Sequence, residues 1–123
     1  MHCVRLSTGN FVVSQNNNNH QICILNTDGQ IIHLYRRSGK SGIGQLNGSL
    51  QLTIDTHNNV LVADFDNNKV CIFSSTLTHL GDVDIPGHRL NGPYAVHFDR
   101  ENNQLYILEF RGKRVCVVGI DYQ

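Results

Sequence analysis

Short apolar segments alternate with polar turns along the whole chain. From Val60 to Phe73 the sequence VLVADFDNNKVCIF consists of an apolar strand, a polar turn and a second apolar strand with a cysteine at its second position. The same order recurs in LYILEFRGKRVCVV (Leu105 to Val118) and, more loosely, in FVVSQNNNNHQICIL (Phe11 to Leu25). Three copies of a unit of this size predict an array of repeated structural units.

Each unit is predicted to contain four short antiparallel strands. Leu-Asn-Gly occurs at residues 46–48 and again at 90–92, a spacing of 44 residues. The segments QLTID and AVHFD alternate between apolar and polar residues, with the period of two of a β-strand. The asparagine pairs at 58–59 and 102–103, and the segments FDNNK and FRGKR, are predicted hairpin turns, because Asn and Gly tolerate positive φ. No stretch has a sustained helical period, so we expect an all-β chain.

The bulk properties exclude several classes of protein. A length of 123 residues suits one domain, and the formal net charge of zero gives no overall attraction to nucleic acid or to a membrane. No apolar run approaches the roughly 18 residues that a membrane helix needs, and the N-terminus lacks the apolar block of a signal peptide. We therefore expect no membrane partner and a cytoplasmic location.

The cysteines are predicted to be small buried apolar residues with free thiols. Cys23, Cys71 and Cys116 hold the same position in the three copies. Equivalent positions on neighbouring repeats are usually farther apart than the roughly 4.4–6.8 Å between Cα atoms that a disulfide allows. No CxxC pair is present, and free thiols fit a reducing compartment.

The size and sequence of the unit resemble a known propeller repeat. Four strands in roughly 40–45 residues are typical of a β-propeller blade. VLVADFDNNKVCIF resembles the signature of NHL repeats, and RRSGKSGIGQLNGS resembles their glycine-rich inter-blade loop, which ends in a proline where this chain has Ser49 and, in the third copy, Pro93. In the first copy Gln15 replaces the aspartate of the signature, and a WD40 repeat is disfavoured because the chain has no tryptophan.

The resemblance implies an arc of an NHL-type β-propeller with three blades at approximately 1–45, 46–89 and 90–123, the last without its outer strand. NHL rings usually have six blades, and three stacked blades leave unpaired edges. We therefore expect this chain to be the C-terminal part of a longer protein that supplies the remaining blades. Closure with a second copy as a homodimer is the alternative.

One face of the predicted propeller arc, formed by the turns and loops at one end of the strands, is predicted to be basic. In a four-stranded blade the turn between the second and third strands and the loop to the next blade lie on one face. Eight of the ten basic residues map there: Arg36, Arg37, Lys40, Lys69, Arg89, Arg111, Lys113 and Arg114. Five acidic residues lie on or near the same face, whereas the opposite face has four acidic residues and Arg100. Basic loops suit phosphate backbones or acidic peptides.

The sequence predicts no catalytic residue, no metal site and no cofactor. Asp64 ends its strand just before a turn, and Glu109 has the same place in the next copy, so both are interpreted as turn anchors that accept hydrogen bonds from backbone N–H groups. The seven histidines are scattered and form no HExxH motif. The segment SGKSGIG lacks the spacing of a phosphate-binding loop.

The resemblance is greatest to the C-terminal propeller of tripartite-motif NHL (TRIM-NHL) proteins. It implies a non-catalytic scaffold that binds protein or single-stranded RNA, with any ubiquitin-ligase activity in a RING region that this chain lacks. A second reading is a fragment of an NHL-propeller enzyme such as peptidyl-amidoglycolate lyase, although no residue here can be matched to its metal-binding histidines or to its catalytic arginine and tyrosine. A third is an extracellular adhesion scaffold, in which the sequon Asn47-Gly48-Ser49 would carry a glycan.

Overall fold

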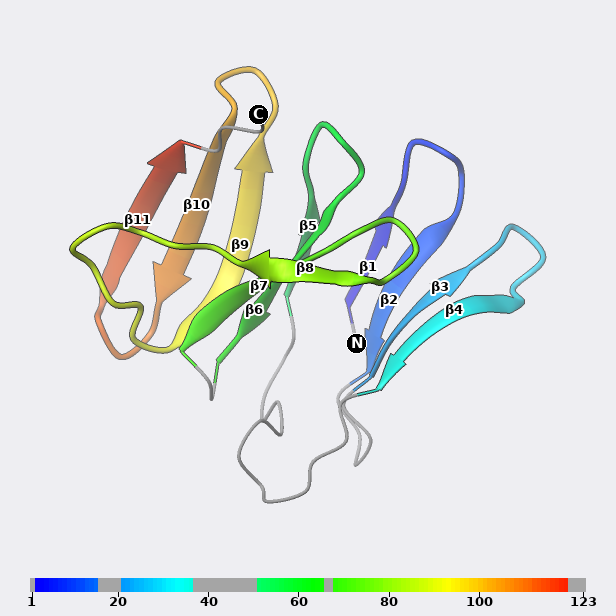
Figure 1. Ribbon diagram of the computed structural model, residues 1–123, viewed down its shortest axis with the longest axis horizontal. Helices are drawn as coiled ribbons and strands as arrows, with labels where there is room; N and C mark the ends of the chain where they lie inside the picture. The colour runs from blue at the N-terminus through cyan, green and yellow to red at the C-terminus, as the bar shows by residue number, and fades with distance from the viewer. Residues whose placement is uncertain (1, 16–20, 37–50, 66–67, 120–123) are drawn as a thin grey trace.

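The chain folds into three successive antiparallel sheets, which the computed structural model describes for residues 2–15, 21–36, 51–65 and 68–119 (Figure 1). The first blade contains β1 (His2–Arg5), β2 (Phe11–Gln15), β3 (Gln21–Leu25) and β4 (Ile31–Arg36). The second contains β5 (Leu52–Ile54), β6 (Val60–Asp64), β7 (Lys69–Phe73) and β8 (His79–Asp82). The third contains β9 (Pro93–Asp99), β10 (Gln104–Glu109) and β11 (Arg114–Gly119). Among the described residues no helix is long and apolar enough to cross a membrane.

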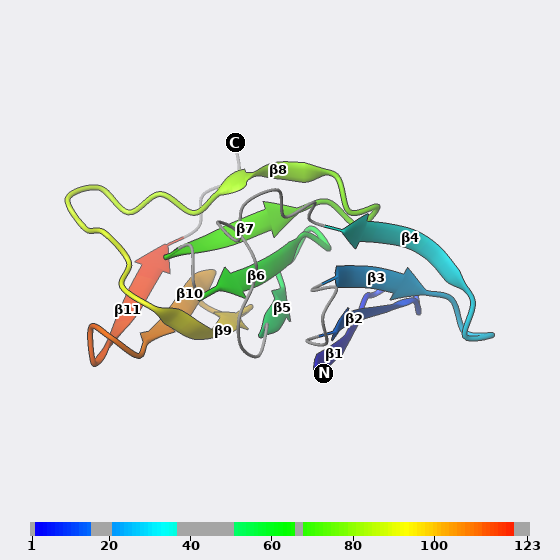
Figure 2. The same cartoon turned by 90° about the horizontal axis from the view of Figure 1, so that it is seen from below.

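The sheets pack side by side as blades of a propeller arc. Each sheet keeps the chain order of its strands, and β5 contacts both β1 and β9. Figure 2 shows β1, β5 and β9 along one side of the arc, and β4 and β8 along the other. The first strand of each blade is therefore the inner one. The predicted all-β propeller arc, whose last blade lacks an outer strand within the described residues, is confirmed.

The apolar core lies between neighbouring blades, which explains the uninterrupted apolar run of β6. Val60 and Val62 pack in a cluster with residues of the first blade, including Val12. The residues between them in sequence, Leu61 and Ala63, pack in a second cluster with residues of the third blade. Successive side chains of a strand point to opposite faces. A strand with a blade on each side therefore buries every residue, as β6 does.

Hydrogen bonds between neighbouring turns confirm that the turns lie on two opposite faces. The β1–β2 and β5–β6 turns meet where the Ser7 N–H donates to Asn58 Oδ1 at 3.2 Å. On the other face the Gly92 N–H, in the loop that leads to β9, donates to Asn68 Oδ1 of the β6–β7 turn at 2.8 Å. In Figure 1 the turns that follow β1, β5 and β9 lie at the top, whereas the β10–β11 turn lies at the bottom.

Five described residues other than glycine have a positive φ, and four of them lie at equivalent turn positions of the second and third blades. Asn58 (φ 60°) corresponds to Asn103 (φ 53°), and Asn68 (φ 55°) corresponds to Lys113 (φ 51°). Asn occupies the left-handed region at lower cost than most residues. Lys113 is therefore the member of this set whose side chain fits the backbone least well.

Candidate functional site

The predicted basic face is partly described by the structure. Arg37, Lys40 and the side chain of Arg36 lie outside the described residues. On the remainder of this face the exposed cations are Arg89, Arg111, Lys113 and Arg114, and Lys69 is half-buried. A role of this face in binding stays a prediction.

Ion pairs divide these cations into two groups. Arg114 Nε donates to Glu109 Oε2 at 2.8 Å, and Lys69 Nζ lies 3.7 Å from Asp82 Oδ2. These two charges are compensated within the protein. Arg89 and Lys113, by contrast, have no ion-pair partner within the described part of the chain. The cations available to a ligand are therefore fewer than the sequence suggests.

Aromatic rings lie beside the available cations. The guanidinium carbon of Arg111 is 4.7 Å from the centroid of the Phe65 ring. The Phe110 ring is 6.2 Å from that of Phe65 and 6.0 Å from that of Tyr94, the latter in an edge-to-face arrangement. Phe110 is 63% exposed and Tyr94 is 41% exposed. We call Phe65, Tyr94, Phe110, Arg111 and Lys113 the aromatic–basic surface.

A glycine lets the second and third blades approach closely at this surface. Gly92 has a φ of +69°, and a Cβ atom there would lie 3.0 Å from Arg111 Cγ and 3.2 Å from Phe65 Cε2. The Phe110 N–H donates to the Gly92 carbonyl at 2.8 Å, which fixes the β10–β11 turn against the inter-blade loop. Beside this turn an open cavity of about 480 Å³ is lined by Tyr94, Phe110, Arg111, Lys113 and Val115 among others.

Glu109 is buried at the centre of a hydrogen-bond network that joins the third blade to the loop before it. Its Oε1 accepts from the Asn91 N–H at 2.7 Å, and its Oε2 lies 3.2 Å from His88 Nε2 and accepts from Arg114 Nε. The Cys116 thiol donates to the same Oε2 at 2.8 Å. These contacts reach the inter-blade loop and the neighbouring strand, so Glu109 connects elements beyond its own turn.

The network shifts the pKa values of two of its members in opposite directions. Burial alone would raise the pKa of Glu109, but hydrogen bonds from Cys116, Asn91, Arg114 and His88 outweigh it and lower the pKa from 4.5 to about 2. Burial, followed by the hydrogen bond to the Glu109 carboxylate and its charge, raises the pKa of the Cys116 thiol from 9.0 to about 11. At neutral pH the pair is therefore a neutral thiol beside a carboxylate.

This geometry does not match a nucleophilic triad. In a triad the histidine contacts the nucleophile through one ring nitrogen and the carboxylate through the other. Here His88 Nε2 faces both Cys116 Sγ, at 3.2 Å, and Glu109 Oε2, and Nδ1 faces Arg114 Nη2 at 2.8 Å. A protonated thiol is also a poor nucleophile. The cluster is consistent with a structural network.

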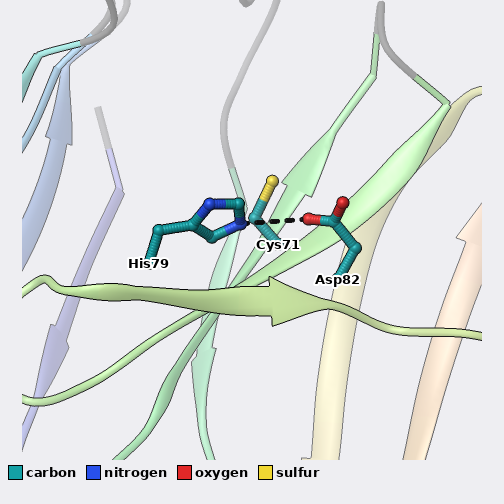
Figure 3. Close-up of side chains that lie close together, drawn as sticks. All are labelled: Cys71, His79 and Asp82. Carbon is teal, nitrogen blue, oxygen red and sulfur yellow. Dashed lines mark hydrogen bonds and ion pairs between the residues drawn. The ribbon is translucent and has the colours of Figure 1, made fainter.

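A second group of polar side chains lies on the second blade (Figure 3). Cys71, His79 and Asp82 come together on β7 and β8, where His79 Nε2 lies 3.1 Å from Asp82 Oδ1. Cys71 is buried, whereas the other two are exposed. Sequence reasoning missed this group because it treated the cysteine as an apolar residue and the histidine as one of seven scattered ones. The sequence does predict that the strands carrying Cys71 and His79 are neighbours in one sheet, and this pairing is the signal that could have revealed the group.

Asp64 is also buried, and the Cys71 thiol donates to its Oδ2 at 3.9 Å. Residues 66–67 of the turn that it was predicted to anchor lie outside the described residues. Its role as a turn anchor therefore stays a prediction. Among the repeated cysteines, Cys23 and Cys71 are buried and Cys116 is half-buried, and none of the three is in a disulfide.

Comparison with known proteins gave similar structures and no similar sequence. A scan against protein-family models found no match, and a search of curated proteins found none either. A protein of unknown function from Bacteroides caccae is similar with a TM-score of 0.53 and 18% identity, covering 95% of this chain and 44% of that one. Virginiamycin B lyase from Staphylococcus aureus gives a TM-score of 0.61 and 15% identity, covering 98% and 41%. A streptogramin B lyase gives 0.57 and 12%, covering 98% and 40%.

The chain thus spans less than half the length of these structures. Identities of this size show the fold alone. Together with the three blades packed side by side, these likenesses establish a β-propeller-like fold for this chain.

Proposed function

We propose that this chain is a non-catalytic binding module, of the type of the C-terminal NHL domain of TRIM-NHL proteins, that binds single-stranded RNA at its aromatic–basic surface. The observation that carries this proposal is the placement of the exposed Phe110 ring beside Arg111, which lies over Phe65, and the exposed Lys113. Aromatic rings stack on unpaired bases, and cations beside them pair with the phosphate backbone.

The distribution of charge supports a local binding surface. The net charge of the chain is zero, so attraction to a polyanion depends on where the cations are. Lys69 and Arg114 are compensated by carboxylates, so that among the described residues of this face Arg89, Arg111 and Lys113 are left for phosphate contacts. Three contacts to a single strand predict a slope of about −2 for log affinity against log salt concentration.

The proposal is tested by measuring the affinity of a fluorescently labelled single-stranded RNA over a range of salt concentrations. Replacing Arg111 or Lys113 by Ala is expected to reduce the slope by about 0.7 each, because each removes one phosphate contact. Phe110→Ala is expected to weaken binding by about 1–3 kcal/mol through lost stacking. Since Phe110 is exposed, this variant should remain folded.

Arg100→Ala is the matched control, because Arg100 is an exposed arginine in a turn of the opposite face. It should leave RNA affinity unchanged. If an acidic peptide binds this surface and single-stranded RNA does not, the surface belongs to a protein partner instead. Equal RNA affinity of the wild type and of Phe110→Ala would contradict the stacking model.

A further inference from the structure

The second blade brings three side chains that bind transition metals to one place through an irregularity in its outer strand. Residues three apart in a regular strand point to opposite faces of the sheet. In β8, however, His79 pairs with Phe73 and Gly81 pairs with Ile72, so Leu80 is an additional residue in the ladder. This bulge turns His79 and Asp82 to the same face, where Asp82 lies directly opposite Cys71.

The same register shift occurs in the first blade, where His33 has the place of Gly81, so the bulge belongs to the repeat. Gly81 has a φ of +152°, in a region that glycine occupies far more readily than residues with a side chain. The ring of His79 also packs against Phe73, with centroids 5.1 Å apart, which holds the imidazole over β7. The position of the histidine is thus fixed by backbone geometry and by packing.

The distances suit a small ion with a tetrahedral ligand set. One ligand atom from each of Cys71, His79 and Asp82 lies within 4.8 Å of the other two. Bonds of about 2.0–2.3 Å to Zn²⁺ place tetrahedral ligand atoms roughly 3.3–3.8 Å apart. Small side-chain movements would close the set. Thiolate, imidazole and carboxylate are all ligands that Zn²⁺ accepts.

The charges around this group favour a cation. The buried Asp64 carboxylate lies next to the Cys71 thiol, and Asp82 contributes a second negative charge. Lys69 Nζ lies 3.7 Å from Asp82 Oδ2, whereas His79 contacts the other oxygen, Oδ1. In the group formed by His88, Glu109 and Cys116, by contrast, Arg114 already binds the carboxylate at 2.8 Å. A metal ion there would have to displace a guanidinium.

The first blade offers an internal control, since the cysteine is present without the other ligands. Cys23 is buried at the position equivalent to Cys71, but its partner across the ladder is Leu34. The position equivalent to His79 is Ile31. The repeat alone therefore supplies the cysteine, and the second blade adds the histidine and the aspartate.

We infer that Cys71, His79 and Asp82 form a binding site for one zinc-like divalent cation that fastens the outer strand β8 to β7. The fourth ligand position is open to water, because His79 and Asp82 are exposed. Binding requires loss of the Cys71 thiol proton, so affinity rises with pH. The role is structural: the ion joins two strands at the outer part of the blade, away from the inner strand β5.

The test is titration of the whole chain with Co²⁺, followed by absorption spectroscopy. We expect one equivalent of Co²⁺ to bind with a thiolate-to-cobalt charge-transfer band, and Zn²⁺ to displace it, as Zn²⁺ binds such sites more tightly. Cys71→Ser should abolish the band, whereas Cys23→Ser should keep it. His79→Gln and Asp82→Asn should weaken affinity at least about tenfold, since loss of a second-shell partner alone costs roughly 10–100-fold.

If Cys71→Ser does not fold, the variants at the exposed residues His79 and Asp82 still test the site. Absence of a charge-transfer band in the wild type would overturn the inference. A band that survives unchanged in both His79→Gln and Asp82→Asn would overturn it too, because the thiol would then bind without the proposed partners. Loss of the band in Cys116→Ser with retention in Cys71→Ser would assign the ion to the other group and equally refute the site.

Discussion

The second and third blades place a cysteine at the same position and use it in different ways. The Cys116 thiol donates a hydrogen bond to the buried Glu109 carboxylate at 2.8 Å, and Arg114 forms an ion pair with that carboxylate. Cys71 lies 3.9 Å from the corresponding carboxylate, Asp64, and faces His79 and Asp82 of the outer strand. A repeat therefore fixes where a side chain lies, and its neighbours on other elements decide its chemistry.

The difference begins with the length of one side chain. Glu109 is one methylene longer than Asp64 and reaches the Asn91 N–H in the inter-blade loop. Its partner cation, Arg114, corresponds to Lys69, which pairs instead with Asp82. The third blade consequently has a closed network around a buried charge, and the second has an open group of polar side chains at its surface.

The largest effect is expected from removing the buried charge of the third blade. Glu109→Gln should lower the free energy of unfolding by about 2–3 kcal/mol, because it leaves Arg114 and the other donors without their carboxylate. Asp82→Asn in the second blade, where the carboxylate is exposed, should cost less than about 1 kcal/mol. Urea unfolding of both variants without added metal measures the difference. An equal loss of unfolding free energy in the two variants would show that the buried and the exposed carboxylate contribute alike to stability.

The same contrast predicts how stability depends on pH. Because the folded-state pKa of Glu109 is lowered to about 2, its ionised form stabilises the fold above its ordinary pKa of 4.5, and this contribution is lost as the pH falls toward 2. The stability gap between the wild type and Glu109→Gln should therefore be full at pH 7 and shrink between about pH 4.5 and 2. Thermal unfolding at a series of pH values tests this. A gap that stays constant would mean that Glu109 is not ionised in the folded protein.

Reactivity of the thiols gives a smaller, local readout. Raising the pKa of Cys116 from 9.0 to about 11 reduces its thiolate fraction at pH 8 by roughly tenfold to a hundredfold. Alkylation of Cys116 should be slower than that of the exposed Cys3 by a comparable factor. In Glu109→Gln the rate at Cys116 should rise while the rate at Cys71 stays constant. Peptide mapping by mass spectrometry distinguishes the sites, and an unchanged rate at Cys116 would exclude the carboxylate as the cause.

The sequence predicted the parts of the fold that follow from local pattern. The alternation of residues and the asparagine turns located the strands, and the repeat located the equivalent cysteines. It could not predict that Leu80 would be an additional residue in β8, because the bulge depends on the register with β7. The partners of Glu109 were hidden for a related reason: His88 and Asn91 lie in an inter-blade loop whose path no periodicity describes.

The contact between Phe65 and Arg111 shows the same limit for the candidate binding surface. The repeat placed both residues in turns on one face, and the basic character of that face followed from their positions. Their stacking depends on how closely two blades pack, and Gly92 permits that approach. Pairing also removed Lys69 and Arg114 from the set of available cations, which a count of charges could not reveal.

The smallest effect is expected at Lys113, where stability and binding can be separated. Lys113 has a φ of 51°, and its counterpart in the second blade is Asn68, with a φ of 55°. Asn tolerates this conformation better than Lys, so Lys113→Asn should raise the free energy of unfolding by about 0.5 kcal/mol. It should also weaken RNA binding, since it removes a phosphate contact. Lys113→Ala removes the same charge but keeps the unfavourable backbone, so it should bind RNA as weakly without becoming more stable. Equal stability of the two variants would refute backbone strain at this turn, and undiminished RNA affinity in both would exclude Lys113 from the binding surface.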